Sequence, residues 1–227
     1  MPDADERHAS FQAMLRALHE RHLVDAPDAR EIWLIRHGDA YSGLESLDDG
    51  PIDPPLSALG REQTDLLAAR LATVPVDQVW SSELRRARET ASTLGAALGL
   101  EPRTDARLRE VRTHWDEGGV SRLNEPGVYP FPEPAEEVVE RLGASVWEIA
   151  GGLPEPAGRR PRAVVISHNA AIGILCQHVM GVSWGAVPIF LQYTSVSVLV
   201  VSGDRMVVQS LADVTHLAAS RRAVRAP

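Results

Sequence analysis

The stretch from Ile32 to Gly38 constrains the fold of this chain more than any other feature of its sequence. Ile32 to Ile35 are apolar and predict a short buried strand. Arg36, His37 and Gly38 follow directly, where that strand would end and a loop begin. In open α/β sheets, ligands bind at the carboxyl ends of the strands. A histidine there, beside a fixed positive charge and a glycine that lets backbone come close, suits attack on phosphate.

The remaining chain alternates between strand-like and helix-like patterns. The expected strands are Glu31–Arg36, Val76–Ser81, Ala163–Ser167, Ser195–Val201 and Arg205–Ser210, the last two as a hairpin. The expected helices are Leu59–Ala72 with Ser57 as its cap, Glu83–Leu98, Pro134–Ile149 and Ala170–Met180. Such alternation is typical of a mostly parallel sheet covered by helices on both faces. We therefore expect the α/β class, as a single three-layer α/β/α domain.

A further helix is expected before the first strand. Apolar residues recur at roughly helical spacing between His8 and Val24, namely Phe11, Met14, Leu15, Leu18 and Leu23. We expect this helix to dock on the domain, with self-association into a homo-oligomer as the alternative. The resulting organisation is an N-terminal helical extension over residues 1–30, a domain over 31–217 and a basic tail over 218–227.

Composition narrows the choice of partners and compartment. A formal net charge of −8 disfavours a nucleic-acid partner, which usually needs a basic face. The polar N-terminus and the lack of an apolar run of spanning length predict no membrane partner and a cytoplasmic location. Cys176, the single cysteine, is expected in the core. No Cys, His and carboxylate set has metal-ligand spacing, so we expect no metal and no cofactor.

Several sequence blocks together resemble the histidine phosphatase (phosphoglycerate mutase-like) superfamily, in particular its phosphatases. Besides Arg36-His37-Gly38, they are Pro55–Gln63, Ser81–Ala91, Leu108–Glu110, Val164–Asn169 and Asp213–Leu217. They occur in the family order and extend from about Glu31 to about Leu217. The resemblance implies that His37 is the nucleophile and carries a covalent phosphohistidine. Its other ring nitrogen would then donate to a backbone carbonyl, near Gly38 or in the Ser57 loop.

Two arginines are the expected phosphate ligands. A guanidinium offers paired N–H groups that match two phosphate oxygens. Arg36 adjoins the nucleophile, and the family pattern selects Arg86 rather than Arg85 or Arg88. The other two are expected on an exposed helix face, paired with Glu89 or a neighbouring acid.

A second histidine, His168, also follows a buried strand. The resemblance implies that it binds the phosphate and stabilises charge in the transition state. Asn169 stands where the family usually has glycine, and it could either donate from its amide or cap the next helix, the cap being favoured. Gly38, Asn169 and His114 complete the expected substrate pocket.

The proton donor is expected to be Glu110, by its place in the resemblance. Protonated, it would supply a proton to the leaving oxygen, and as carboxylate it would then activate water. Asp116 and Glu117 are alternatives, because Trp115–Gly118 resembles a distorted form of the family's Trp-Glu-Gly.

These residues predict a metal-independent phosphomonoester hydrolase acting on a small phosphorylated metabolite. A phosphoglycerate mutase-type phosphotransferase is one alternative, although the short segment after Glu110 favours hydrolysis. A protein phosphohistidine phosphatase is another, because Asp39 and Ala40 after the Arg-His-Gly triplet resemble that group. The third is a non-catalytic binding protein on the same fold.

Overall fold

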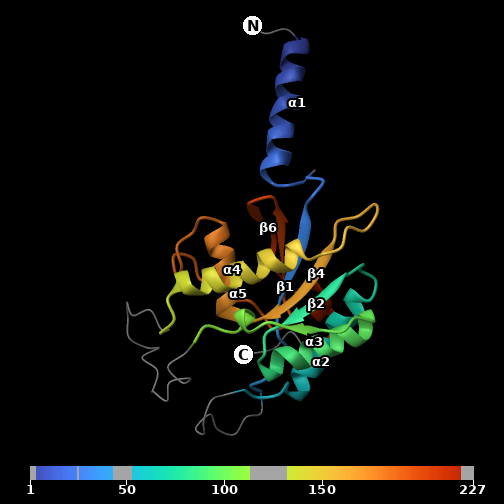
Figure 1. The fold of residues 1–227 in the computed structure, drawn as a ribbon, viewed down its shortest axis with the longest axis vertical. Coiled ribbons are helices and arrows are strands. Elements are labelled where there is room, and N and C mark those ends of the chain that lie inside the picture. The colour runs from blue at the N-terminus through green and yellow to red at the C-terminus, as the bar shows by residue number, and fades with distance from the viewer. Residues whose placement is uncertain (1–3, 25, 43–52, 113–131, 221–227) are drawn as a thin grey trace.

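A six-stranded mixed sheet forms the centre of the protein (Figure 1). The structure is a computed structural model and describes residues 4–24, 26–42, 53–112 and 132–220. The strands are β1 (Arg30–Arg36), β2 (Gln78–Ser81), β3 (Arg103–Thr104), β4 (Arg162–Ser167), β5 (Val196–Ser202) and β6 (Arg205–Asp213). Their order is β3-β2-β4-β1-β5-β6. The strands β3, β2, β4 and β1 pair in parallel. The pairings of β1 with β5 and of β5 with β6 are antiparallel.

Helices cover both faces of the sheet, as the sequence predicts. The helices are α1 (Ala4–Arg21), α2 (Ala58–Leu71), α3 (Arg85–Leu98), α4 (Ala135–Gly151) and α5 (Asn169–Val179), with short 3-10 turns η1 (Ala106–Leu108) and η2 (Thr215–Ala219). The apolar side chains of α4 and α5 join one core cluster, and those of α2 and α3 join the other. The expected three-layer α/β/α architecture is confirmed.

The central strands contribute side chains to both clusters, which explains their continuous apolar sequence. On β1, Ile32 and Leu34 pack toward α4 and α5, whereas Ile35 packs toward α2 and α3. On β4, Val165 packs toward α4 and α5, whereas Ile166 packs toward α2 and α3. Successive side chains of a strand point to opposite faces, so a strand covered on both sides has no polar face.

Most expected elements are found within a few residues of their predicted ends. Ser57 caps α2 as predicted, since its hydroxyl accepts a hydrogen bond from the Gly60 N–H. The short strand β3 and the turns η1 and η2 were not predicted. They are two to five residues long, too short for a periodic pattern to develop.

The prediction that the N-terminal helix docks on the domain is wrong. Figure 1 shows α1 projecting away from the sheet and its covering helices. The apolar side chains of its middle, Phe11, Met14 and Leu18, are exposed. Its C-terminal end is held: Leu23 is buried, and Arg205 donates to the Glu20 carbonyl oxygen at 3.0 Å. Self-association through α1 stays a prediction.

Candidate active site

Three parallel strands end side by side and carry the functional residues at their carboxyl ends. In the pairing of β1 with β4, Arg36 lies opposite Ser167, and in that of β2 with β4, Ser81 lies opposite Ile166. The ladder continues one step further, because the His37 N–H donates to the Ser167 carbonyl at 3.1 Å. This register brings His37 and His168 together, with 5.0 Å between their ring centroids.

The His37 ring is fixed in one tautomer. Its Nδ1 lies 2.7 Å from the carbonyl oxygen of Gly38, which can only accept, so Nδ1 carries the proton. The Arg86 Nε–H donates to Nε2 of His37 at 3.1 Å, so Nε2 carries the lone pair. Burial, reinforced by the charges of Arg86 and Arg36, lowers the pKa of His37 well below its usual range. His37 is therefore a neutral imidazole whose Nε2 electron pair accepts the hydrogen bond from Arg86.

His168 is held in the other tautomer. A guanidinium can only donate, so Nδ1 of His168 accepts from Arg86 Nη2 at 3.4 Å. Nε2 then donates to the Ser82 hydroxyl at 2.7 Å. Burial, with the neighbouring His37 and both arginines, lowers the pKa of His168 well below its usual range. Its Nδ1 thus lies on the Arg86 side of the ring, where His37 also lies.

The two expected arginines are both buried in this cluster, unlike the neighbours of Arg86. Arg86 is 4% exposed, whereas Arg85 and Arg88 are exposed and Arg85 pairs with Glu89 at 2.8 Å. Arg36 donates from Nη1 to the Leu191 carbonyl at 2.6 Å. Within the described residues, the buried Arg36 Nε and Arg86 Nη1 atoms have no hydrogen-bond partner. Unsatisfied N–H groups of this kind are ready donors for an anion.

Glu110 lies between η1 and the start of α5. Its Oε1 accepts from the N–H groups of Val111 at 2.9 Å and Ala171 at 3.0 Å, and its Oε2 accepts from Ala170 at 3.4 Å. The carboxyl group therefore sits at the N-terminus of α5, on N–H groups two and three residues along the chain from His168. Its negative charge also reaches Arg36, where it opposes the lowering of the pKa by burial.

A buried ion pair fixes the segment that carries Glu110. Arg141 on α4 forms a fork with the Glu133 carboxylate, at 2.6 and 3.0 Å. Its other N–H groups donate to three carbonyl oxygens of that segment, those of Arg107, Arg109 and Glu110. All five guanidinium N–H groups of Arg141 are thus used, and Glu133 is only 3% exposed.

Asn169 does not cap α5, and the favoured interpretation of this residue is wrong. The N-cap position belongs to His168, whose side chain makes no capping hydrogen bond, and Glu110 binds the helix N–H groups instead. The Asn169 Oδ1 accepts from the Leu191 N–H at 2.9 Å. Because Arg36 binds the carbonyl of the same residue, Asn169 holds the backbone segment on which Arg36 rests.

Gly38 is required for close packing. A Cβ built at this position would lie 2.7 Å from the Gly60 carbonyl oxygen and from Thr64 Oγ1. The Gly38 N–H donates to Thr90 Oγ1 at 3.1 Å, which ties the loop to α3. Among the other candidates, His114, Asp116 and Glu117 lie outside the described residues, so their roles stay predictions.

Three residues at the site were not singled out from the sequence. Ser82 binds His168, and Thr90 binds Gly38. Tyr193 lies 3.8 Å, measured to its ring centroid, from Cζ of Arg36. Ser82 follows the end of β2 directly, and that position was the available signal. Thr90 lies in the Ser81–Ala91 block, four residues after Arg86, and that was its available signal, whereas nothing in the sequence around Tyr193 marks a functional residue.

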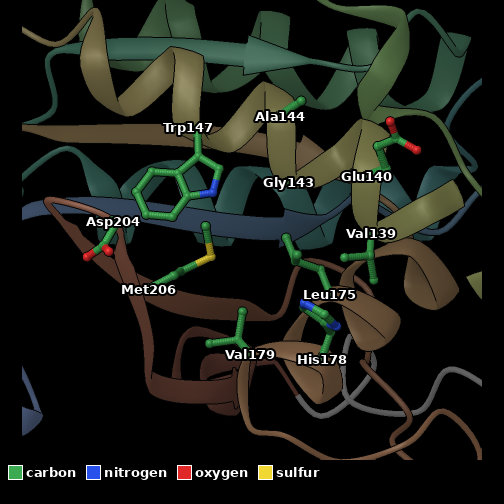
Figure 2. A pocket seen from close by; sticks show the side chains of 10 residues that line it. All are labelled: Val139, Glu140, Gly143, Ala144, Trp147, Leu175, His178, Val179, Asp204 and Met206. Atoms are coloured by element: carbon green, nitrogen blue, oxygen red, sulfur yellow. The ribbon is translucent and has the colours of Figure 1, made fainter. Parts of the chain in front are cut away.

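A separate hollow of about 540 Å³ lies between α4, α5 and β6 (Figure 2). Figure 2 shows Trp147 and Glu140 on the α4 side of it, and Leu175 and His178 on the α5 side. No arginine or lysine lines this hollow, so it lacks the donors that a phosphate requires. In the part of the chain that the structure describes, no group of three or more His, Cys, Asp or Glu could hold a metal ion. No described helix is long and apolar enough to cross a membrane.

The chain as a whole is similar to known proteins. The chain matches the model of the histidine phosphatase superfamily, branch 1, over residues 32–214, and it belongs to this superfamily. Within the family, it is 29% identical over 208 residues to the probable phosphoglycerate mutase GpmB of Salmonella arizonae, covering 82% of this chain and 94% of that protein.

Solved structures with a similar fold include those of a phosphatase. The mycobacterial glucosyl-3-phosphoglycerate phosphatase superposes with a TM-score of 0.66 at 27% identity, covering 81% of this chain and 99% of that chain. A complex of the same phosphatase with inorganic phosphate superposes with a TM-score of 0.65, also at 27% identity, covering 81% of this chain and 97% of that one. The family of this chain therefore includes phosphatases as well as proteins named as mutases.

Proposed function

We propose that this protein is a phosphomonoester hydrolase that works through a phosphohistidine on His37. The observation that carries the proposal is the fixed tautomer of this ring. Gly38 holds the proton on Nδ1, and Nε2 is left as a neutral lone pair beside Arg86 and His168. An attacking nitrogen and two buried arginines with unused N–H groups are what transfer of a phosphoryl group requires.

In the first step, Nε2 of His37 attacks phosphorus and the bond to the ester oxygen breaks. The hydrogen bond donated by the Arg86 Nε–H shifts from the attacking nitrogen to a phosphate oxygen. Arg36 neutralises negative charge on the other phosphate oxygens. His168 can donate to the same phosphoryl group through Nδ1 once its proton lies on that nitrogen, with Nε2 then accepting from the Ser82 hydroxyl. Glu110, in its protonated form, gives its proton to the leaving alcohol oxygen.

In the second step, a water molecule replaces the alcohol. Glu110, now a carboxylate, takes a proton from that water as its oxygen attacks phosphorus. The bond from phosphorus to Nε2 breaks, inorganic phosphate is released, and His37 returns to the neutral form. What supports this role for Glu110 is that backbone N–H groups of α5 hold its carboxyl group close to His168 along the chain.

The experiment that tests this function is trapping of the intermediate. Rapid acid-free quenching with a ³²P-labelled ester should leave label on the wild-type protein, in an acid-labile and base-stable form. The His37→Ala variant should carry no label and should lose turnover while keeping its circular-dichroism spectrum. Labelling of His37→Ala to the wild-type level would contradict the assignment of the nucleophile.

Mutase activity is the second candidate, because a relative 29% identical to this chain is named a probable phosphoglycerate mutase. Both reactions use the same phosphohistidine and differ in whether water or a phosphorylated acid accepts the phosphoryl group. Nuclear magnetic resonance of 3-phosphoglycerate with added bisphosphoglycerate distinguishes them. A hydrolase releases inorganic phosphate, whereas a mutase produces 2-phosphoglycerate faster than it releases phosphate.

A further inference from the structure

Aromatic side chains flank the two phosphate-binding arginines. The Phe190 ring centroid lies 5.2 Å from Cζ of Arg36, and the Tyr41 ring centroid lies 5.8 Å from Cζ of Arg86. Both rings are exposed to solvent, Phe190 by 62% and Tyr41 by 36%. We call these two residues the aromatic flank. Tyr193 differs from them, because it is buried and stacks closely on Arg36.

Neither ring belongs to a hydrophobic core cluster of the described residues. Large exposed aromatic side chains are costly to leave in water, and clusters of them mark binding sites. Each ring of the aromatic flank lies within about 6 Å of a guanidinium that would hold the phosphate. A phosphate held by both guanidiniums would lie close to these rings, which are then available to the alcohol portion of the ester.

The described charges near the site disfavour a second anionic group on the substrate. The cations next to the cluster are already paired with acids: Arg85 with Glu89, Arg109 with Glu83 and Arg112 with Glu137. Asp53 adds a negative charge 3.6 Å from Nη1 of Arg86. A carboxylate on the alcohol portion would find the negative charge of Asp53 there, and these three arginines are already neutralised by their acids.

From this arrangement we infer that the substrate is a phosphomonoester whose alcohol carries a flat apolar group, such as an aromatic ring, and no carboxylate. The inference rests on the proposed phosphatase site, and it names the class of substrate for that site. The aromatic flank packs against the flat group, while Arg36 and Arg86 bind the phosphate. Burial of one ring against two others should strengthen binding about tenfold over an ester that lacks it.

Calorimetry with non-hydrolysable phosphonates tests this without requiring turnover. The three probes are 2-phenylethylphosphonate, ethylphosphonate and 2-carboxyethylphosphonate, with inorganic phosphate as reference. The wild-type protein should bind the phenylethyl compound about tenfold more tightly than the ethyl compound, and the carboxyethyl compound most weakly. In Phe190→Ala, the preference for phenylethyl over ethyl should fall to about twofold.

Phe11 provides the matched control, since it is a phenylalanine of similar exposure, 51%, on the projecting helix α1. Phe11→Ala should keep the full preference. Equal binding of the phenylethyl and ethyl compounds by the wild type, or tightest binding of the carboxyethyl compound, would overturn the inference while inorganic phosphate still binds. Failure of inorganic phosphate and of all three phosphonates to bind would instead overturn the phosphate site and, with it, the inference.

Discussion

Arg86 donates a hydrogen bond from Nε to Nε2 of His37 at 3.1 Å. In the free protein this bond occupies the electron pair that would attack phosphorus. A phosphate oxygen is a better partner for the guanidinium than a neutral ring nitrogen, because it carries charge. We therefore expect substrate binding to shift this hydrogen bond to the phosphate and to free Nε2 of His37.

Replacing Arg86 by alanine should weaken binding of inorganic phosphate or vanadate by about 10- to 100-fold, the effect of one charge-assisted contact. Arg85→Ala is the control, because its side chain is exposed and pairs with Glu89. It should change the dissociation constant by less than about threefold. Calorimetry measures both, and equal losses in the two variants would contradict the assignment of Arg86.

Glu110→Gln should slow the hydrolysis of alkyl phosphates by about 10²- to 10⁴-fold, because an alkoxide needs a proton to leave. Formation of the phosphoenzyme from a nitrophenyl ester should be slowed much less, since nitrophenolate leaves without help. Rapid-mixing kinetics separate this step from hydrolysis of the intermediate, which should also slow. Equal effects on both esters in the first step would point to Asp116 or Glu117 as the donor.

Arg141→Lys tests whether the buried pair with Glu133 positions the proton donor. Lysine keeps the charge but cannot reach the carboxylate and three carbonyl groups together. We expect the rate ratio of alkyl to nitrophenyl esters to fall about tenfold, with phosphate binding little affected. A loss of stability alone would leave this ratio unchanged and would show a purely structural role.

Arg159→Lys is the matched control for that variant. Arg159 also forms a fork with a carboxylate, that of Asp77, at 2.6 and 2.8 Å, but on a surface loop away from the histidines. Its replacement should leave the rate ratio at the wild-type value. A fall in the ratio as large as that in Arg141→Lys would mean that the assay responds to any lost arginine fork.

His216 should make the protein less stable in mild acid. Burial, with the charge of Arg70, lowers the pKa of His216 to about 4, whereas an unfolded histidine titrates near 6.5. The folded state thus favours the neutral ring, and the stability that this provides is present above pH 6.5 and is lost as the pH falls toward 4.

Between pH 7 and pH 5 this histidine should lower the free energy of unfolding by about 2 kcal/mol. Urea unfolding at the two pH values measures it, with His216→Gln as the comparison. His37 and His168 act in the same direction in the wild type and in His216→Gln. The difference between the two proteins in the slope of unfolding free energy against pH therefore isolates His216. Identical slopes would show that His216 does not contribute.

The sequence by itself determined the class of fold and most members of the cluster. Continuous apolar strands such as Ile32–Ile35 and Val164–Ile166 imply a sheet covered on both faces, and functional residues then follow at the strand ends. The resemblance also selects Arg86 rather than Arg85 or Arg88, and helix spacing agrees that only one of the three can point into the site, because neighbours on a helix point about 100° apart.

Only the tertiary structure decided how these residues are held. Which nitrogen of His37 carries the lone pair depends on the Gly38 carbonyl and the Arg86 guanidinium. Arg86 is 49 residues away from His37 in the sequence. Asn169 looks like a helix cap in sequence, but Glu110 reaches the same N–H groups from another segment. The aromatic flank joins residues on two loops, Tyr41 and Phe190. Such relationships depend on which distant segments meet, and a local pattern contains no information about that.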